Sequence, residues 1–130
     1  MELEPVRFVC VMPSDDFADA TSKRFIINRL ASEFGYKAIF PAYDKTKLDF
    51  SLIETKESFR RSDFVFVDLS DERPSCYFEL GIAESVGAKI IVVAKGGTPI
   101  HQTSYREVVD FFDSLEVFEA VVRDRFQEIS

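Results

Sequence analysis

The fold is decided by residues 62–94, which read SDFVFVDLSDERPSCYFELGIAESVGAKIIVVA. Two apolar runs within it, residues 64–67 and 88–94, have the continuous β-prone composition of strands that are buried on both faces. Between these runs, Ser75 is placed to cap a helix over residues 76–86, and a glycine follows where that helix should end. The stretch therefore predicts a strand–helix–strand crossover, the unit that joins two parallel strands.

Strands and helices alternate on both sides of this stretch. Before it, the expected elements are a strand at 6–12, a helix at 18–34 that ends at Gly35, a strand at 36–40, and a helix at 51–61 with a capping box. After it, they are a strand at 108–112 and a last helix capped by Asp113-Ser114. Five strands alternating with helices predict a three-layer, flavodoxin-like α/β fold with a doubly wound parallel sheet in the order 2-1-3-4-5.

Helical spacing also predicts which side chains face the sheet. In the first helix, the apolar residues near this spacing are Phe25, Ile26, Ile27, Leu30, Ala31 and Phe34. In the second helix, Leu52, Ile53 and Phe59 are expected to point inward. These residues form the predicted cover of the sheet.

Composition limits the class of protein. The 130 residues are 46% hydrophobic, which predicts a single domain over residues 1–130 with a sizeable core. A net charge of −7 argues against nucleic acid or an anionic membrane as the main partner, and no apolar run indicates a signal peptide or a membrane span. Cys10 and Cys76 have no metal-binding or disulfide spacing, so we expect reduced thiols, a cytoplasmic protein, and neither a metal nor a cofactor.

The predicted topology places a ligand site. In a doubly wound sheet the ligand crevice lies beyond the carboxyl ends of the strands where the winding reverses, here between the first and third strands. The loops at residues 12–17 and 68–76 would face this crevice, and both are rich in hydroxyls and carboxylates. The candidate substrate-binding residues are Ser14, Asp15, Asp68, Ser70 and Ser75, with Tyr43 and Tyr77 as rings that could stack on a base.

Glu79 is the candidate reactive group. It is expected at the end of the first turn of the helix, where the helix dipole favours an ionised carboxylate. Such an anion suits attack on an electrophilic sugar carbon and is a poor general acid. The alternative is that Glu79 is only a favourable first-turn acid, that Asp68 only caps a turn, and that Ser14 only caps a helix.

Three segments resemble a known family. They are residues 68–70 (DLS), residues 74–90 (PSCYFELGIAESVGAKI) and residues 9–14 (VCVMPS). Their order is similar to the signature of nucleoside 2-deoxyribosyltransferase-like proteins, and nearest to the bacterial TIR-like nucleotide-binding branch. The resemblance extends from about residue 7 to residue 126.

The resemblance implies a function and an assembly. Glu79 matches the glutamate that takes the sugar from the base, so the implied ligand is a nucleoside, a nucleotide or an NAD-like molecule. The loop that contains Ser14 matches a phosphate-binding loop of the related glycosidases. Relatives complete each pocket with a neighbouring chain, so we expect a homodimer or a larger homo-oligomer, with Phe111, Phe112 and Phe118 as material for the interface.

One departure from the family leaves two functions open. The glycosidases have an Asp shortly before the central strand, whereas this sequence has Thr55 there, with Glu54 and Glu57 beside it as candidate proton donors. The first function is an N-glycosidase or deoxyribosyltransferase that uses Glu79, with Glu54 or Glu57 as the acid. The second is a non-catalytic nucleotide-binding sensor or signalling module that uses the same crevice.

Overall fold

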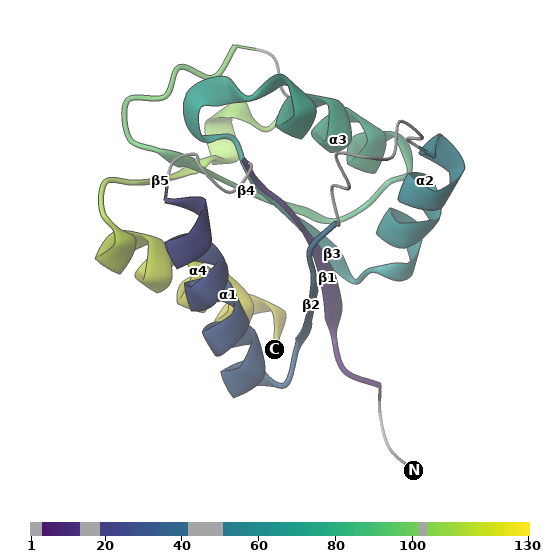
Figure 1. Cartoon of the computed structure of the whole chain (residues 1–130), viewed down its shortest axis with the longest axis horizontal. Helices are drawn as coiled ribbons and strands as arrows, with labels where there is room; N and C mark the ends of the chain where they lie inside the picture. Colours follow the sequence, from purple (N-terminus) through teal and green to yellow (C-terminus); the bar gives the residue numbers. More distant parts are fainter. Residues whose placement is uncertain (1–3, 14–18, 42–50, 102–103) are drawn as a thin grey trace.

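The computed structural model describes residues 4–13, 19–41, 51–101 and 104–130, and its strands form one parallel sheet (Figure 1). The order of the strands is β2-β1-β3-β4-β5. These strands are β1 (Arg7–Val11), β2 (Lys37–Ile39), β3 (Phe64–Asp68), β4 (Ile90–Lys95) and β5 (Asp110–Phe112). The predicted flavodoxin-like fold and its strand order are confirmed.

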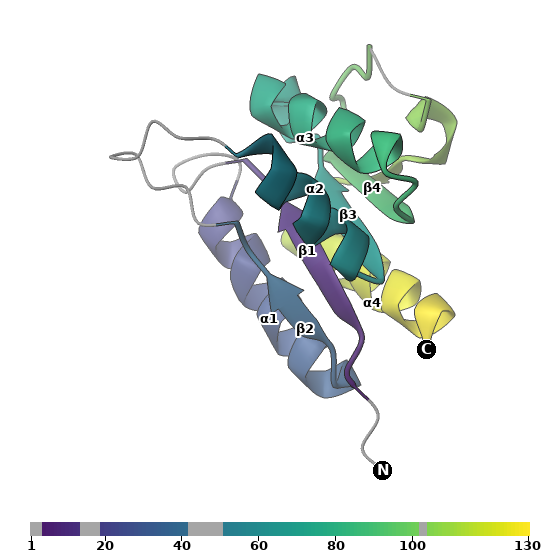
Figure 2. The same ribbon diagram turned by 90° about the vertical axis from the view of Figure 1, so that its right-hand side faces the viewer.

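Helices cover both faces of the sheet. They are α1 (Ala20–Phe34), α2 (Leu52–Arg61), α3 (Pro74–Ser85) and α4 (Leu115–Ile129), with the 3-10 turns η1 (Ser70–Glu72) and η2 (Arg106–Val108). Figure 1 shows α1 and α4 on one face and α2 and α3 on the other. In the turned view of Figure 2, α2 lies over β1, and α3 lies beside α2. Within the described residues, no helix is long and apolar enough to cross a membrane.

The central strand β3 supplies both halves of the core. All of its residues are buried, as the continuous apolar run predicted. Because successive side chains of a strand point to opposite faces, Phe64 and Phe66 pack under α1 and α4, whereas Val65 and Val67 pack under α2 and α3. By the same alternation, the side chain of Asp68 points to the same face of the sheet as Phe64 and Phe66, the face that α1 covers.

The predicted helix ends are confirmed where they depend on local chemistry. Gly35 has a φ of 71°, the left-handed conformation that glycine adopts without strain, and its N–H donates to α1 carbonyls. The Ser51 hydroxyl accepts a hydrogen bond from the N–H of Glu54, and the Ser114 hydroxyl accepts one from the N–H of Val117. These caps fix where α1, α2 and α4 begin or end.

Removing the cap of α4 should lower stability. In Ser114→Ala, the first turn of α4 loses the acceptor for the Val117 N–H, and we expect the free energy of unfolding to fall by about 1 kcal/mol. Urea unfolding measures the change. Asp113→Ala is the matched control, since Asp113 is exposed and should change stability by no more than about 0.5 kcal/mol. Equal losses in the two variants would contradict the assignment of Ser114 as the cap.

Three predicted inward side chains are exposed instead. Phe25 is 69% exposed, because it lies about 200° around α1 from both Lys23 and Ile27, which form the buried face. Leu52 and Ile53 are also exposed, the latter by 77%, because they occupy the first turn of α2, whereas Phe59, two turns later, is buried. The spacing of apolar residues did not indicate where each helix meets the sheet.

The expected interface phenylalanines are mostly part of the core. Phe112 and Phe118 are buried and pack edge to face with ring centroids 5.0 Å apart. Phe111 alternates to the opposite face of β5 from Phe112 and is 46% exposed. Phe112 and Phe118 were therefore wrong as interface residues, and their burial removes that basis for a homo-oligomer.

Candidate functional site

Helix α3 begins earlier than the sequence indicated. Arg73 is the N-cap residue and Pro74 is the first helical residue, a position where the fixed φ and the missing N–H of proline are favourable. The prediction that Ser75 caps this helix was wrong, and Ser75 is an exposed residue of the first turn. Glu79 is consequently the sixth residue of α3 and lies in its second turn.

Burial determines the electrostatics of Glu79. Its side chain is partly buried, and the resulting loss of hydration raises the pKa of the Glu79 carboxyl above its ordinary value. Among the described residues, no ion pair or hydrogen bond to this carboxylate offsets that effect. The expectation that the helix dipole favours its ionised form was wrong, because the dipole acts mainly within the first turn. Glu79 is a carboxylate that the fold holds partly dehydrated.

The raised pKa of Glu79 predicts how stability depends on pH. A carboxyl whose pKa is higher in the folded chain binds its proton more tightly there, so the free energy of unfolding falls as the pH rises through that pKa. Glu79→Gln should be more stable than the wild type at neutral pH and about equally stable below about pH 4. Urea unfolding of both proteins across this range measures the difference. A stability difference that does not change with pH would contradict the raised pKa.

Asp68 has an internal role. It is 0% exposed, and its Oδ2 atom accepts an ion-paired hydrogen bond of 2.8 Å from Lys23 Nζ. Its Oδ1 atom accepts hydrogen bonds from the backbone N–H and the hydroxyl of Ser70, at 2.9 and 2.6 Å. The alternative interpretation, a carboxylate that caps the turn after β3, is therefore what the structure shows.

Ser70 belongs to the same hydrogen-bond network. It is buried, and its hydroxyl also accepts a hydrogen bond of 2.9 Å from the N–H of Lys95 at the end of β4. Asp68 points to the face of α1, whereas α3, which carries Glu79, lies on the opposite face. Asp68 and Ser70 hold the ends of β3 and β4 together, so we no longer assign them as direct substrate contacts.

Tyr77 belongs to a cluster on the other flank of α3. Its hydroxyl donates to Glu72 Oε1 at 2.8 Å, and Nδ1 of His101 lies 2.9 Å from both oxygens of the same carboxylate. Burial acts to raise the pKa of Glu72, but the hydrogen bonds from His101 and Tyr77 outweigh it and hold that pKa below its usual value. Because Tyr77 and Glu79 are two positions apart, they point about 200° from each other around the helix.

The backbone at Asp71 and Glu72 is strained. Asp71 and Glu72 have φ angles of 58° and 49°, in the left-handed region that residues other than glycine rarely adopt. Residues in such conformations occur preferentially at functional sites and turns. The sequence did not indicate that His101 pairs with Glu72, since the two residues are 29 positions apart in the chain. The sequence contains no local signal for this pair.

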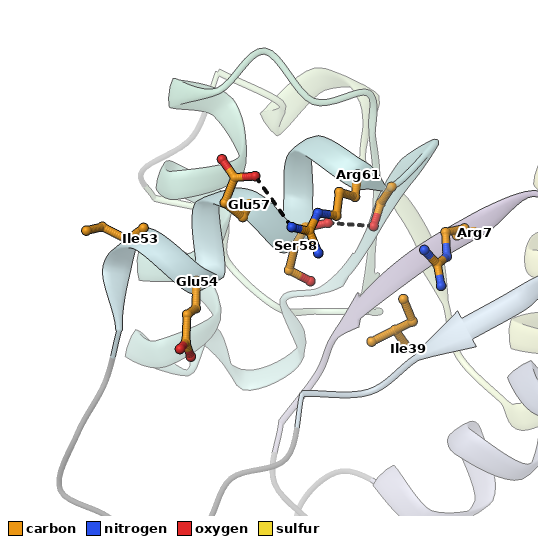
Figure 3. A pocket seen from close by; sticks show the side chains of 8 residues that line it. Arg7, Ile39, Ile53, Glu54, Glu57, Ser58 and Arg61 are labelled. Atoms are coloured by element: carbon orange, nitrogen blue, oxygen red, sulfur yellow. Dashed lines mark hydrogen bonds and ion pairs between the residues drawn. The ribbon is translucent and has the colours of Figure 1, made fainter.

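The two candidate proton donors line a pocket beside α2. Glu54 and Glu57 line a cavity of about 350 Å³ beside α2, together with Arg7, Ile39, Ile53, Ser58, Arg61 and Ser62 (Figure 3). Glu57 also pairs with Arg60 at 3.1 Å. Glu79 is not among the described residues that line this pocket. The structure therefore does not bring Glu54, Glu57 and Glu79 together in one cavity.

Three predicted site residues, Ser14, Asp15 and Tyr43, lie outside the described residues. Of the remaining ones, Glu79 is the partly buried carboxylate on the flank of α3 away from Tyr77, and Ser75 is exposed in the first turn of the same helix. Neither the models of known protein families nor the curated protein sequences include a match to this chain. The function must therefore be inferred from the chemistry of Glu79 and its surroundings.

Proposed function

We propose that this protein cleaves the N-glycosidic bond of a nucleoside, a nucleotide or an NAD-like molecule, with Glu79 as the nucleophile. The observation that supports this proposal is the partly buried Glu79 carboxylate, whose pKa burial raises and which no cation among the described residues neutralises. A carboxylate that has lost part of its hydration attacks an electrophilic carbon more readily than one in bulk water. The resemblance of residues 74–90 to the deoxyribosyltransferase signature points to the same role.

The proposed reaction has two displacement steps. The Glu79 carboxylate attacks C1′ of the sugar, the C1′–N bond breaks, and its electron pair leaves with the base. Water, or a second base in a transferase, then attacks C1′ and loses a proton. Glu79 leaves as the regenerated carboxylate, and the configuration at C1′ is retained.

The surroundings of Glu79 favour a substrate with a good leaving group. A positioned acid contributes roughly 10² to 10⁴ in rate, and Glu54 and Glu57 line a pocket to which Glu79 does not contribute among the described residues. Nicotinamide in NAD is attached through a cationic ring nitrogen and leaves as a neutral molecule without a proton. We therefore propose an NAD-like molecule as the preferred substrate, ahead of ordinary nucleosides.

A direct experiment tests this function. The purified protein is incubated with NAD, with a panel of nucleosides and with nucleoside monophosphates, and the release of free base is followed by liquid chromatography. We expect nicotinamide to be released from NAD, with slower or undetectable release from unmodified nucleosides. No release from any substrate would count against an enzyme and in favour of binding without turnover.

A nucleotide-binding module without turnover is the second candidate. The placement of Glu54 and Glu57 favours it, since these candidate proton donors line a pocket to which Glu79 does not contribute among the described residues. In such a module Glu79 would accept hydrogen bonds from ribose hydroxyls. Calorimetric binding of NAD without release of nicotinamide would be its signature.

The proposal also includes a cellular location and an assembly. Cys10 and Cys76 are buried as free thiols, which supports a reducing compartment such as the cytoplasm. Burial raises the pKa of Cys76 to about 12, with further contributions from the charges of Glu79 and Asp68, so this thiol is not a competing nucleophile. A homodimer or larger assembly remains part of the proposal through the family resemblance, and light scattering measures it.

A further inference from the structure

The pocket beside α2 has an unusual lining for the flank of a helix. Residues Glu54, Glu57, Ser58 and Arg61 recur at i, i+3, i+4 and i+7, so they form one stripe along α2 (Figure 3). All four side chains are polar or charged. The apolar part of the lining comes from Ile39 and Ile53, as in many small-molecule sites.

Arg7 contributes a guanidinium to this pocket from the sheet. It belongs to β1, and alternation along that strand places its side chain on the same face as Val9 and Val11, which pack under α2 and α3. Arg7 is partly buried, and its backbone N–H donates to Asp63. Within the described part of the chain, its guanidinium makes no ion pair or hydrogen bond. Its five donors therefore line this pocket without an anion from the described residues bound to them.

Charged side chains of both signs line this pocket. Figure 3 shows Arg7 on the side of the pocket formed by the sheet, Glu54 on α2 away from it, and the guanidinium of Arg61 turned toward Glu57 between them. Arg61 is held only loosely, since the Glu57 carboxylate with which it pairs is 4.0 Å away and its side chain is mostly exposed. Glu54 and Arg61 are seven residues apart, which corresponds to about 10 Å along the helix axis.

We propose that this pocket is a second binding site, for a small zwitterion. Its carboxylate or phosphate would bind Arg7 and Arg61, and its cationic group would bind Glu54. Two guanidinium groups suit either anion, because each can donate two parallel hydrogen bonds. The aliphatic middle of the ligand would lie on Ile39. The site goes beyond the proposed reaction, because Glu79 is not among its described lining residues.

Nuclear magnetic resonance titration tests the site directly. Free lysine is the probe, since an aliphatic chain separates its carboxylate from its side-chain ammonium, and norleucine is the matched probe that lacks this ammonium. The signals observed are the side-chain Nε–H groups of Arg7 and Arg61. We expect lysine to cause saturable shifts with a Kd in the millimolar range, and norleucine to bind about tenfold or more weakly. A parallel titration with phosphoethanolamine shows whether phosphate or carboxylate is the better anionic group.

Variants connect the binding to individual side chains. Arg7→Gln should weaken lysine binding about tenfold or more, and Arg61→Gln should weaken it measurably even if the Arg7 variant folds poorly. Arg60→Gln is the matched control, because Arg60 neighbours Arg61 on α2 but does not line the pocket, and it should bind as the wild type does. The proposal is overturned if lysine gives no saturable shift, if norleucine binds equally well, or if Arg7→Gln and Arg61→Gln both bind like the wild type.

Discussion

Glu79→Gln should reduce the release of base from the preferred substrate by about 10³-fold or more, because removing the nucleophile of a covalent mechanism removes the step that forms the intermediate. Glutamine has nearly the same shape as glutamate but cannot attack C1′. The measurement is single-turnover release of nicotinamide or another base, followed by chromatography. Full activity in Glu79→Gln would end every catalytic interpretation and leave the nucleotide-binding module.

Glu54→Gln and Glu57→Gln are the matched controls for this experiment. Both residues were candidate proton donors, and both line the pocket beside α2. Glu79 is not among the described residues that line this pocket. We therefore expect both variants to keep the activity of the wild type on an NAD-like substrate. A loss of about 10²-fold or more in either one would instead show that it acts as the acid for the leaving base.

The sequence predicted those parts of the fold that depend on local patterns. The continuous apolar run at 64–67 gave the buried central strand, and Gly35 and Ser114 gave helix ends that depend on one residue and its neighbours. Strand order followed from the alternation of strands and helices, because short right-handed connections permit few topologies. Glu79 was correctly placed on the helix that follows the central strand.

Interactions between distant residues could not be predicted in this way. His101 and Glu72 are 29 positions apart, and Lys23 and Asp68 are 45 apart, so no local pattern connects either pair. The predicted start of α3 was wrong by only two residues, but this changed the expected electrostatics of Glu79. A helix that begins at Pro74 instead of Cys76 moves Glu79 out of the first turn, and burial then replaces the helix dipole as the main influence on its carboxyl.

Lys23→Met should lower the free energy of unfolding by about 3–5 kcal/mol, which is the usual cost of leaving one partner of a buried ion pair without the other. Lys23 and Asp68 are 2% and 0% exposed, and the ammonium lies 4.7 Å from the ring centroid of Phe112. In the variant, the Asp68 carboxylate would keep the hydrogen bonds from Ser70 but lose the one cation that pairs with it among the described residues. Urea unfolding measures the loss.

Two further variants show whether this loss comes from the charge. Arg29→Met removes another cation from α1, but its ion pairs with Glu33 and Glu119 are largely exposed, so the expected cost is no more than about 1 kcal/mol. In the double variant Lys23→Met/Asp68→Asn no charge is buried, and the amide oxygen can still accept from Ser70. It should recover part of the stability lost in Lys23→Met. If the double variant is less stable than Lys23→Met, the cost of the single change comes from packing against Phe112 and not from the unpaired carboxylate.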